Sequence, residues 1–437
     1  MENKNFNDFR FQPFMDEIVE KLHFKKPTEI QQKVIPAILN GTSVIGQSHT
    51  GSGKTHAYLL PLFNNINTEK RTVQFVITAP TRELATQIND EVKKIIKFAG
   101  KEKQWISKLL VGGTDKQKMT EKLKTPPHII VGTPGRILDL VKDDAVSIYS
   151  AKAFIIDEAD LMLDLGFIND VDQLLVKSNR DVQLLVFSAT IPQRLEHFFK
   201  KYLENPLHVK IDDELSPETM EHWLVDTRHR DEAQIIAKIS KVINPYLAII
   251  FTNGKEKANQ LAEALQDKGL EVGLIHGGLA PRERKRALKD IQNLRFQYIV
   301  ATDLASRGID IKGVSHVINA QLPKEEDFYV HRVGRTARAG MEGTAISLYN
   351  ETDTNLISKL QQKGLTFTFF DIKNGEWAEM KAWNERTLRT KTDANVDKEA
   401  WKRVKKEKTV KPGYKKKMKR QQETIKKRLS KNTKYKK

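Results

Sequence analysis

Short apolar runs alternate with longer amphipathic stretches through most of the chain, and this alternation is the feature that most restricts its fold. Between about residues 40 and 210 the runs are TVQFVITA (72–79), HIIVG (128–132), AFIID (153–157) and VQLLVFSA (182–189). They are apolar on both faces and are separated by helix-like segments such as ELATQINDEVKKIIKFA. Strands buried on both faces and joined by helices are typical of parallel sheets built from βαβ units.

A second series of such runs follows in the later half of the chain. Its members are YLAIIFTN (246–253), EVGLIH (271–276), QYIVATD (297–303), SHVINA (315–320) and TAISLY (344–349). The sequence therefore predicts an α/β fold with two doubly wound parallel-sheet domains in tandem, at residues 1–210 and 224–373. Residues 211–223, IDDELSPETMEHW, are polar, contain Pro217 and show no apolar period, which predicts a flexible linker.

The positive charge of the chain is concentrated at its end. The net charge is +18, yet residues 401–437 hold 18 Lys and Arg against two acidic residues, and the other 400 residues hold 56 basic and 54 acidic residues. Strand-like runs stop after about residue 373, so residues 374–437 are predicted to form a basic, largely disordered C-terminal arm. Such an arm favours a polyanionic partner, whereas the folded part is almost neutral.

The composition excludes several classes of protein. The chain has no cysteine, which rules out disulfide partners, thiolate catalysis and Cys-bound zinc. No apolar run approaches the ~20 residues that a membrane-spanning helix needs, and the segment MENKNFNDFR has no apolar stretch of the signal-peptide type. We therefore expect a cytoplasmic protein without a membrane partner.

The stretch SHTGSGKT (48–55) predicts a phosphate-binding loop. It lies between a short apolar run, TSVIG, and a helix-like run, HAYLLPLFNNI, so that backbone N–H groups and the positive end of the helix dipole point at one place. The strict pattern G-x-x-x-x-G-K-(S/T) fits at Gly53, Lys54 and Thr55 but has Ser48 in its first position. Lys54 would reach the terminal phosphates, and Thr55 would offer its hydroxyl to Mg²⁺. For this octamer alone, a glycine-rich turn without a ligand is the alternative.

The run AFIID ends in two carboxylates, Asp157 and Glu158. They follow a strand at its C-terminal end, where ligands of open α/β sheets bind. Asp157 can hold Mg²⁺, and Glu158 can orient or deprotonate an attacking water. An acidic pair after a strand can also be a helix N-cap cluster, but its combination with SHTGSGKT favours a nucleotide site.

Asp157-Glu158-Ala159-Asp160 is the signature of the DEAD-box RNA helicases, and residues 6–350 resemble this family, most closely its bacterial cold-shock branch. A dozen motifs occur in the family's order. The resemblance implies two RecA-like domains, ATP and Mg²⁺ as cofactors, and an RNA-dependent ATPase that unwinds or remodels short RNA duplexes. It also implies a role in ribosome assembly, RNA decay or cold adaptation, with ribosomal precursors or the RNA-decay machinery as partners.

The resemblance assigns the nucleotide site residue by residue. FKKPTEIQ (24–31) resembles the Q motif, so Gln31 would read the adenine edge. Arg335 and Arg338 of HRVGRTAR (331–338) are candidate arginine fingers, which would complete a catalytic set with Lys54 and Glu158. The alternative for HRVGRTAR is a solvated basic helix with its arginines near one face. The ATP-binding positions are Phe6, Phe24, Gln31, Ser48, His49, Thr50, Gly51, Ser52, Gly53, Lys54, Thr55, Asp157 and Asp310, of which Thr55 and Asp157 would hold the metal.

Further motifs resemble the RNA-binding and coupling elements of the family. These are PTRELA (80–85), GG (112–113), TPGR (133–136), SAT (188–190), IIFTN (249–253), IHGG (275–278) and ATDLASRGID (301–310). Short side chains let the backbone approach phosphates, which predicts RNA binding without base reading. The implied RNA-binding positions are Pro80, Thr81, Arg82, Gly112, Gly113, Thr133, Pro134, Gly135, Arg136, His276, Gly277 and Thr302, and the positions that couple ATP to RNA are Asp160, Ser188, Thr190 and His331.

The chain departs from the family pattern at four positions. His23 and Ala337 stand where Gly is usual, Pro281 where Gln is frequent, and Gly254 where Thr is frequent. Two other functions stay open at this stage. One is a DNA helicase or translocase, and the other is a passive RNA clamp or chaperone in which the nucleotide acts as a switch.

Overall fold

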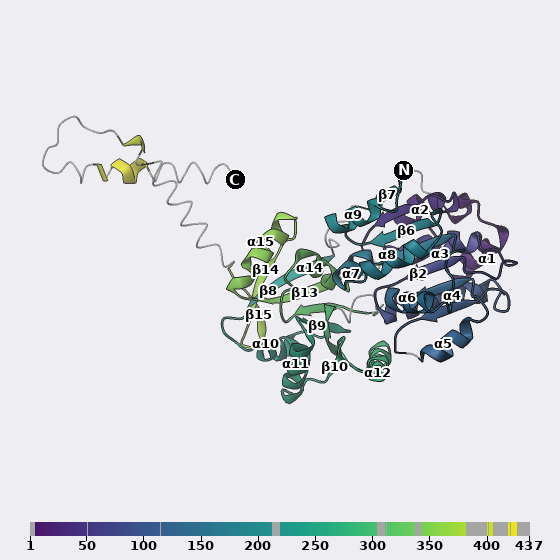
Figure 1. Cartoon of the computed structure of the whole chain (residues 1–437). Helices are drawn as coiled ribbons and strands as arrows, with labels where there is room; N and C mark the ends of the chain where they lie inside the picture. The colour runs from purple at the N-terminus through teal and green to yellow at the C-terminus, as the bar shows by residue number, and fades with distance from the viewer. Residues whose placement is uncertain are drawn as a thin grey trace. The chain divides into compact units, whose positions relative to one another are not determined.

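The computed structural model describes residues 5–49, 51–113, 115–211, 219–303, 311, 313–336, 342–381, 400, 402–404, 418–419 and 421–425. The chain divides into two compact units, Met1–Phe367 and Thr368–Lys437. The first unit holds the first predicted α/β domain and the second one up to Phe367, and many of their helices and strands are labelled in Figure 1. No helix in these ranges is both long and apolar enough to cross a membrane.

The first sheet has seven strands in the order β3-β4-β2-β5-β6-β1-β7, and every pairing in it is parallel. Its central strands lie in the apolar runs that predicted them, whereas β3 and β7 were not predicted because their residues are mostly exposed or half-buried. The strands are β1 Val44–Gln47, β2 Phe75–Thr78, β3 Ser107–Leu110, β4 Ile129–Gly132, β5 Ala153–Asp157, β6 Gln183–Ser188 and β7 Leu207–Lys210.

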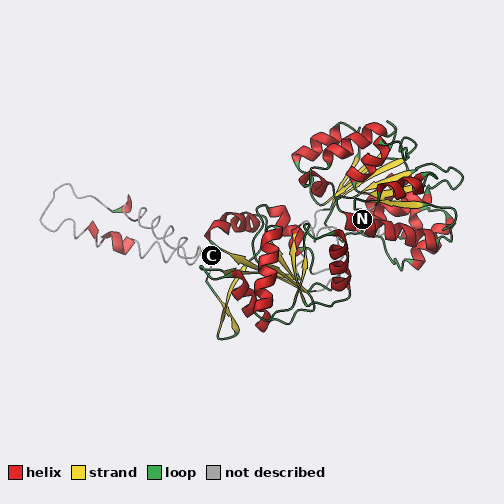
Figure 2. Cartoon of the chain, turned by 60° about the horizontal axis from the view of Figure 1, so that its bottom comes forward, coloured by secondary structure: helices red, strands yellow, loops and turns green. Residues whose placement is uncertain are grey.

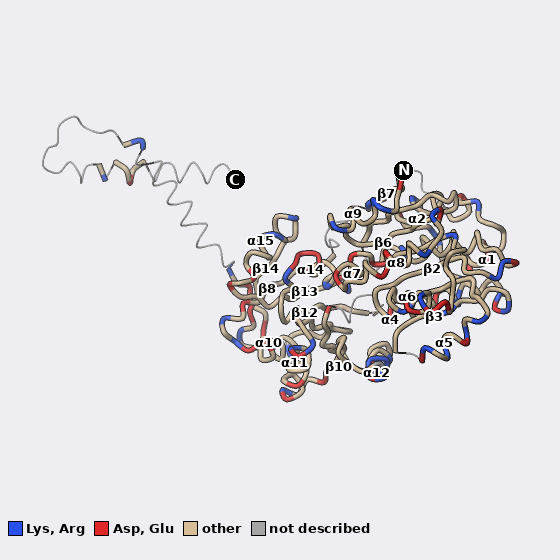
Figure 3. The backbone as a smooth tube through the Cα atoms, in the orientation of Figure 1, with Lys and Arg blue, Asp and Glu red and all other residues tan. Residues whose placement is uncertain are grey.

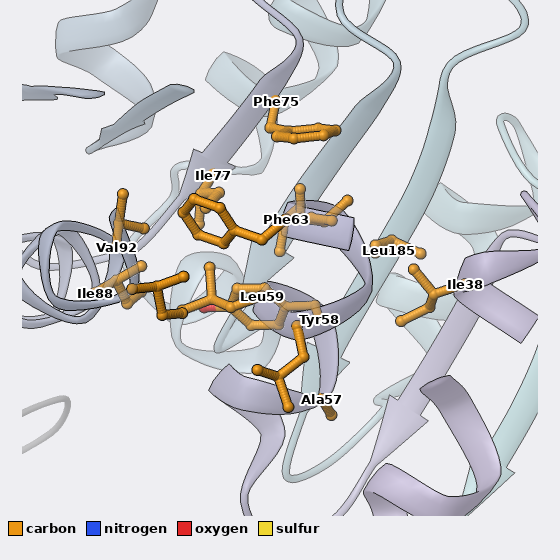
Figure 4. Close-up of a cluster of buried hydrophobic side chains, with 14 of the residues drawn as sticks. Ile38, Ala57, Tyr58, Leu59, Phe63, Phe75, Ile77, Ile88, Val92 and Leu185 are labelled. Atoms are coloured by element: carbon orange, nitrogen blue, oxygen red, sulfur yellow. The ribbon is translucent and has the colours of Figure 1, made fainter. Parts of the chain in front are cut away.

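Helices cover both faces of this sheet (Figure 2). Because alternate residues of a strand point to opposite faces, Ile155 of β5 joins one hydrophobic cluster while Phe154 and Ile156 join the other. Part of the first cluster is drawn in Figure 4. The helices are η1 Phe6–Phe9, α1 Pro13–Lys21, α2 Glu29–Leu39, α3 Lys54–Asn64, α4 Arg82–Phe98, α5 Lys116–Leu123, α6 Pro134–Lys142, α7 Ala159–Asp164, α8 Ile168–Lys177 and α9 Gln193–Lys200.

The second α/β domain repeats this architecture with the parallel strand order β10-β11-β9-β12-β13-β8. Its core includes Ile249, Phe251, Ile299 and Val317 from three adjacent strands. The strands are β8 Met220–Asp226, β9 Ala248–Thr252, β10 Val272–Ile275, β11 Tyr298–Thr302, β12 His316–Asn319 and β13 Gly343–Tyr349. The helices are α10 Glu232–Val242, α11 Lys255–Asp267, α12 Pro281–Gln292, α14 Glu326–Val333, η3 Glu351–Asp353 and α15 Thr354–Gln362.

Two expected boundaries need correction. Strand β8 begins at Met220 and pairs with β13, so residues 220–223 of the predicted linker belong to the second sheet; residues 212–218 lie outside the described ranges. The strand was missed because Glu221 and His222 interrupt its apolar pattern. Strands also continue past residue 373, because Thr368–Lys373 (β14) and Glu376–Glu379 (β15) form an antiparallel hairpin. Most of the predicted arm after residue 381 lies outside the described ranges.

Candidate active site

The predicted phosphate loop connects β1 to α3 at the C-terminal edge of the first sheet. Gly51 and Gly53 have φ of 93° and 94°, in the left-handed region that favours glycine. Lys54 is 6% exposed, and its Nζ donates a hydrogen bond to the Ser48 carbonyl oxygen at 2.9 Å. The Ser48 and Ser52 hydroxyls lie 2.7 Å apart, which gives Ser48 a partner within the loop. The loop is therefore folded around the lysine that the sequence singled out; of its other predicted residues, His49 is exposed and Thr50 lies outside the described ranges.

The predicted adenine-reading residue supports this loop. Gln31 on α2 accepts a hydrogen bond from the Thr28 backbone N–H at 3.0 Å and donates one to the Gly53 carbonyl at 3.1 Å. A Cβ atom on Gly53 would lie 2.7 Å from Gln31 Nε2, so this approach requires glycine. Phe24 is stacked on the buried Phe6, with ring centroids 5.9 Å apart. The Phe24 ring also contacts His56, two residues after Lys54, with ring centroids 4.8 Å apart. The aromatic pair and Gln31 therefore both lie next to the phosphate-loop region.

The end of strand β5 places the two acidic residues beside the phosphate loop. Asp157 is 3% exposed, and the Glu158 Oε1 lies 3.7 Å from the Lys54 Nζ. Burial and the neighbouring Glu158 charge raise the pKa of Asp157 to about 6, against the opposing effect of Lys54. Glu158 has φ of 54°, a strained conformation for a residue with a side chain, and such strain concentrates at functional sites. One lysine and two carboxylates therefore converge where the sequence predicted them.

The four predicted coupling residues also come together. The Asp160 backbone N–H donates to the Ser188 hydroxyl at 3.0 Å, and the Thr190 backbone N–H and hydroxyl donate to Asp160 Oδ2 at 3.0 and 3.1 Å. His331 Nε2, on α14 of the second α/β domain, lies 3.6 Å from the same oxygen. Asp160 thus joins β6 to α14.

The arginine motif is not a solvated helix. Helix α14 ends at Val333, and Arg332 and Arg335 are only 2% and 4% exposed. Arg332 donates to both Asp303 oxygens, at 2.5 and 2.8 Å, and its guanidinium also binds Asn253 Oδ1 at 2.7 Å. Arg335 Nε donates to the His331 carbonyl at 3.4 Å. The alternative of an exposed basic face is therefore wrong for these two residues; Arg338 and Asp310 lie outside the described ranges.

The RNA-motif residues of the first domain lie at helix starts and a turn. Thr81 caps α4, because its side-chain oxygen accepts a hydrogen bond from the Leu84 N–H at 3.2 Å. The exposed Arg82 lies against Gly112: a Cβ atom added to Gly112 would be 2.9 Å from Arg82 Nη2. PTRELA and GG are thus adjacent. The remaining positions are the buried Pro80, Gly113 with φ of 81°, Thr133 at the N-cap of α6, Pro134 in its first turn, and the half-buried Gly135 and Arg136.

In the second domain, His276 shapes the loop between β10 and α12. Its Nε2 lies 2.8 Å from Asn259 Oδ1, and its Nδ1 accepts the Gly278 N–H at 3.1 Å. Both ring nitrogens are thus occupied, which leaves the exposed backbone at Gly277 as the accessible part of the loop. Thr302, 8% exposed, ends β11.

Three departures from the family pattern have local explanations. His23 has φ of 58°, the conformation for which glycine is the usual residue. Gly254 has φ of 112° before α11, which a β-branched residue would not adopt. Pro281 is at the first turn of α12, where proline is favourable, and Arg284 of that helix still pairs with Glu83 of α4, Nε to Oε1 at 2.9 Å. Ala337 lies outside the described ranges.

The donor set near the loop fits a hard cation. Within the described ranges, no group of three His, Cys, Asp or Glu residues could hold a metal by itself. Magnesium typically takes one or two protein oxygens and completes its shell with water and phosphate. The Thr55 hydroxyl and the Asp157 carboxylate are oxygens of this kind, and they follow β1 and β5, which flank β6 in the sheet.

Sequence reasoning missed two groups at this site. The first group is Tyr58, whose Oη donates a hydrogen bond to Asp157 Oδ2 at 2.9 Å. The sequence feature that could have indicated it is a tyrosine inside the apolar run HAYLLPLF, one helical turn after Thr55. The second group is Arg332, which is buried and donates hydrogen bonds to both Asp303 and Asn253. The sequence feature that could have indicated Arg332 is its position in the motif HRVGRTAR, in which only the neighbouring arginines were assigned a role.

Comparison with known proteins agrees with this geometry. The family "DEAD/DEAH box helicase" matches residues 28–198, and "Helicase conserved C-terminal domain" matches residues 231–340. The chain is 51% identical over 434 residues to the DEAD-box ATP-dependent RNA helicase CshB of Bacillus subtilis, covering 99% of both chains. It is 48% identical over 425 residues to the protein of that name from Listeria monocytogenes, covering 97% of both chains.

Solved structures of similar fold include complexes with nucleotide and RNA. Dbp5 of S. cerevisiae bound to RNA and ADP BeF3 is 30% identical with a TM-score of 0.76, over 84% of this chain and 95% of that one. Mss116p bound to ssRNA and AMP-PNP is 26% identical with a TM-score of 0.73, over 91% of this chain and 84% of that one. Both halves of the chain are thus RecA-like domains, and the protein belongs to the DEAD-box ATP-dependent RNA helicases.

Proposed function

We propose that the protein hydrolyses ATP in response to RNA and uses this cycle to separate short RNA duplexes locally. One observation carries the proposal. Glu158 lies 3.7 Å from Lys54 of the phosphate loop, while Asp160, two residues later, lies 3.6 Å from His331 of the second domain. A single turn of chain therefore joins the nucleotide site to the other half of the protein.

In this proposal the phosphate loop binds ATP. The Lys54 ammonium would leave the Ser48 carbonyl oxygen and bind phosphate oxygens instead, and Gly51, with open space beside its Cα, leaves the backbone accessible to them. Gln31 would contact adenine from the position it holds beside Gly53. Mg²⁺, when bound through Thr55 and Asp157, would neutralise phosphate charge.

Hydrolysis needs a group that orients water and groups that neutralise developing charge. Glu158 would orient the water, because its backbone holds it beside Lys54 at the end of β5. Arg335 and Arg338 would neutralise charge on the γ-phosphoryl oxygens, an effect worth about 10³–10⁵ in rate for an arginine finger. Turnover would then depend on both α/β domains.

RNA would be held by its backbone. The exposed Arg82 and the open loop at Gly277 offer charge and N–H groups to phosphates. The basic residues after 400 would add affinity by counterion release. This activity would serve a cytoplasmic role in ribosome assembly, RNA decay or cold adaptation, with ribosomal precursors or the decay machinery as partners; the relatives are themselves named DEAD-box ATP-dependent RNA helicases.

The proposal is tested by comparing ATP turnover of the full-length protein without nucleic acid, with RNA, and with DNA of the same sequence. We expect stimulation by RNA and little by DNA, because the 2′-hydroxyl distinguishes the two backbones. Equal stimulation would favour a DNA helicase or translocase. Strand separation that needs no hydrolysis would favour a passive clamp or chaperone.

A further inference from the structure

Tyr58 lies inside the hydrophobic core of the first domain, yet its hydroxyl reaches the active site. The side chain is 0% exposed, and its ring centroid lies 5.2 Å from that of Phe187. Figure 4 shows the ring between the side chains of α4 and β6, including Ile88 and Leu185. From this position Tyr58 Oη donates a hydrogen bond to Asp157 Oδ2 at 2.9 Å.

This hydroxyl binds one of the two residues that we assign to the metal and lies near the other. Thr55 precedes Tyr58 by three residues on the same face of α3, so the two side chains are neighbours. The other Asp157 oxygen, Oδ1, accepts the Glu158 backbone N–H at 3.0 Å. Both carboxylate oxygens are thus oriented by the protein, and one phenol links α3 to β5.

The hydroxyl is not needed to fill the core. Phenylalanine would occupy nearly the same volume and would spare the cost of burying a polar group. A tyrosine phenol carries its proton at neutral pH, so Tyr58 can donate to the carboxylate without any change in ionisation. The tyrosine hydroxyl is therefore explained by its hydrogen bond to Asp157 rather than by packing.

We propose that Tyr58 is a positioning residue for magnesium, holding the Asp157 carboxylate in the orientation that binds Mg²⁺ with ATP. This inference rests on the proposed ATP site and adds a residue to it. Groups that orient metal ligands from behind typically contribute about 10–100-fold to metal affinity or activity. Removing one hydroxyl should therefore change the metal requirement measurably while the fold is kept.

The test is Tyr58→Phe in the full-length protein, with a fluorescent ATP analogue as the probe. We expect the Mg²⁺ concentration for half-maximal analogue binding to rise about 10-fold. Binding of the analogue in excess EDTA should stay unchanged, because Lys54 and the loop backbone do not depend on the hydroxyl. The matched control is Tyr329→Phe, since Tyr329 is also 0% exposed and its hydroxyl lies 2.9 Å from His222 Nδ1. The control should keep the wild-type Mg²⁺ requirement.

Two results would overturn the role of Tyr58. One is a Mg²⁺ requirement that is the same in Tyr58→Phe and wild type. The other is an equal loss of binding with and without Mg²⁺, which would make the hydroxyl merely structural. If the wild-type protein itself bound the analogue without any response to Mg²⁺, the metal assignment of Thr55 and Asp157 would fail, and the role of Tyr58 with it.

Discussion

His331 Nε2 lies 3.6 Å from Asp160 Oδ2, and the two side chains are only 7% and 6% exposed. Burial by itself would raise the pKa of Asp160, but the neighbouring His331, with help from Lys54 and the Thr190 backbone N–H, holds this pKa below the ordinary value. Asp160 is therefore ionised, and its partners come from both α/β domains. This relationship makes it a candidate link between ATP state and RNA binding.

Replacing His331 should uncouple the two ligands. We expect His331→Ala to lower RNA-stimulated ATP turnover by roughly 5–150-fold, the usual range of a coupling energy between two sites. ATP binding without RNA should be unchanged, because Lys54 and the loop are untouched. The matched control is His208→Ala, an exposed histidine on β7. If stimulation by RNA were the same in His331→Ala and the control, Asp160 would not act through this contact.

Replacing Gln31 should separate two possible roles of its amide. In the structure the amide supports Gly53, and in the proposed complex it also contacts adenine. A lost hydrogen bond costs about 0.5–1.5 kcal/mol, so we expect Gln31→Ala to weaken ATP binding several-fold and GTP binding less. Gln32→Ala is the control, because its amide binds the Pro27 carbonyl away from the loop. Equal weakening of ATP and GTP would leave Gln31 with a supporting role alone.

The raised pKa of Asp157 predicts a pH effect on stability. Because this pKa is about 6 in the fold against an ordinary 3.8, the folded protein binds more protons than the unfolded chain between these values. The Asp157 contribution to stability is therefore present below about pH 4 and is lost as the pH rises to about 6.

Asp157→Asn should remove this pH-dependent contribution to stability. Relative to wild type, the free energy of unfolding of the variant should increase by at most roughly 3 kcal/mol between about pH 4 and 6. Above this range the difference should stay constant. Denaturant unfolding in EDTA measures it, with Asp16→Asn, an exposed carboxyl on α1, as the control. A relative stability that does not vary with pH would contradict the assignment.

Deleting residues 401–437 should weaken RNA binding without impairing catalysis. The segment carries 18 basic and two acidic residues, so its contribution should be electrostatic and steeply dependent on salt. We expect ATP turnover at saturating RNA to stay nearly unchanged while the RNA concentration for half-maximal stimulation rises. A loss of turnover that excess RNA cannot restore would show that the arm is more than an accessory.

Contiguous motifs were predictable because they combine chemistry with local geometry. SHTGSGKT and AFIIDEAD each place their functional residues at the end of a strand, and parallel pairing brings those ends to one edge of the sheet. The sequence could therefore predict that Lys54 and Glu158 would meet. It could equally predict the central strands, which are continuous apolar runs.

Contacts between distant segments were not predictable in this way. Tyr58 and Asp157 are 99 residues apart, and Arg332 and Asp303 are 29 apart, so their pairing depends on the register of whole elements. Because arginine is usually exposed, a sequence predicts a surface position for it unless its buried partners are known. Strand β15, EWAE, was missed because its two glutamates are exposed and its other two residues are only half-buried, on a hairpin.

The central claim is that one ATP site, centred on Glu158, drives strand separation. The most direct measurement is strand separation of a short RNA duplex in the presence of ATP, followed over many turnovers with wild type and Glu158→Gln. The substitution keeps the side chain's size and removes the carboxylate that orients the attacking water. We predict that the variant still binds ATP and RNA but neither hydrolyses ATP nor separates duplexes repeatedly. Continued catalytic strand separation by Glu158→Gln would contradict the account.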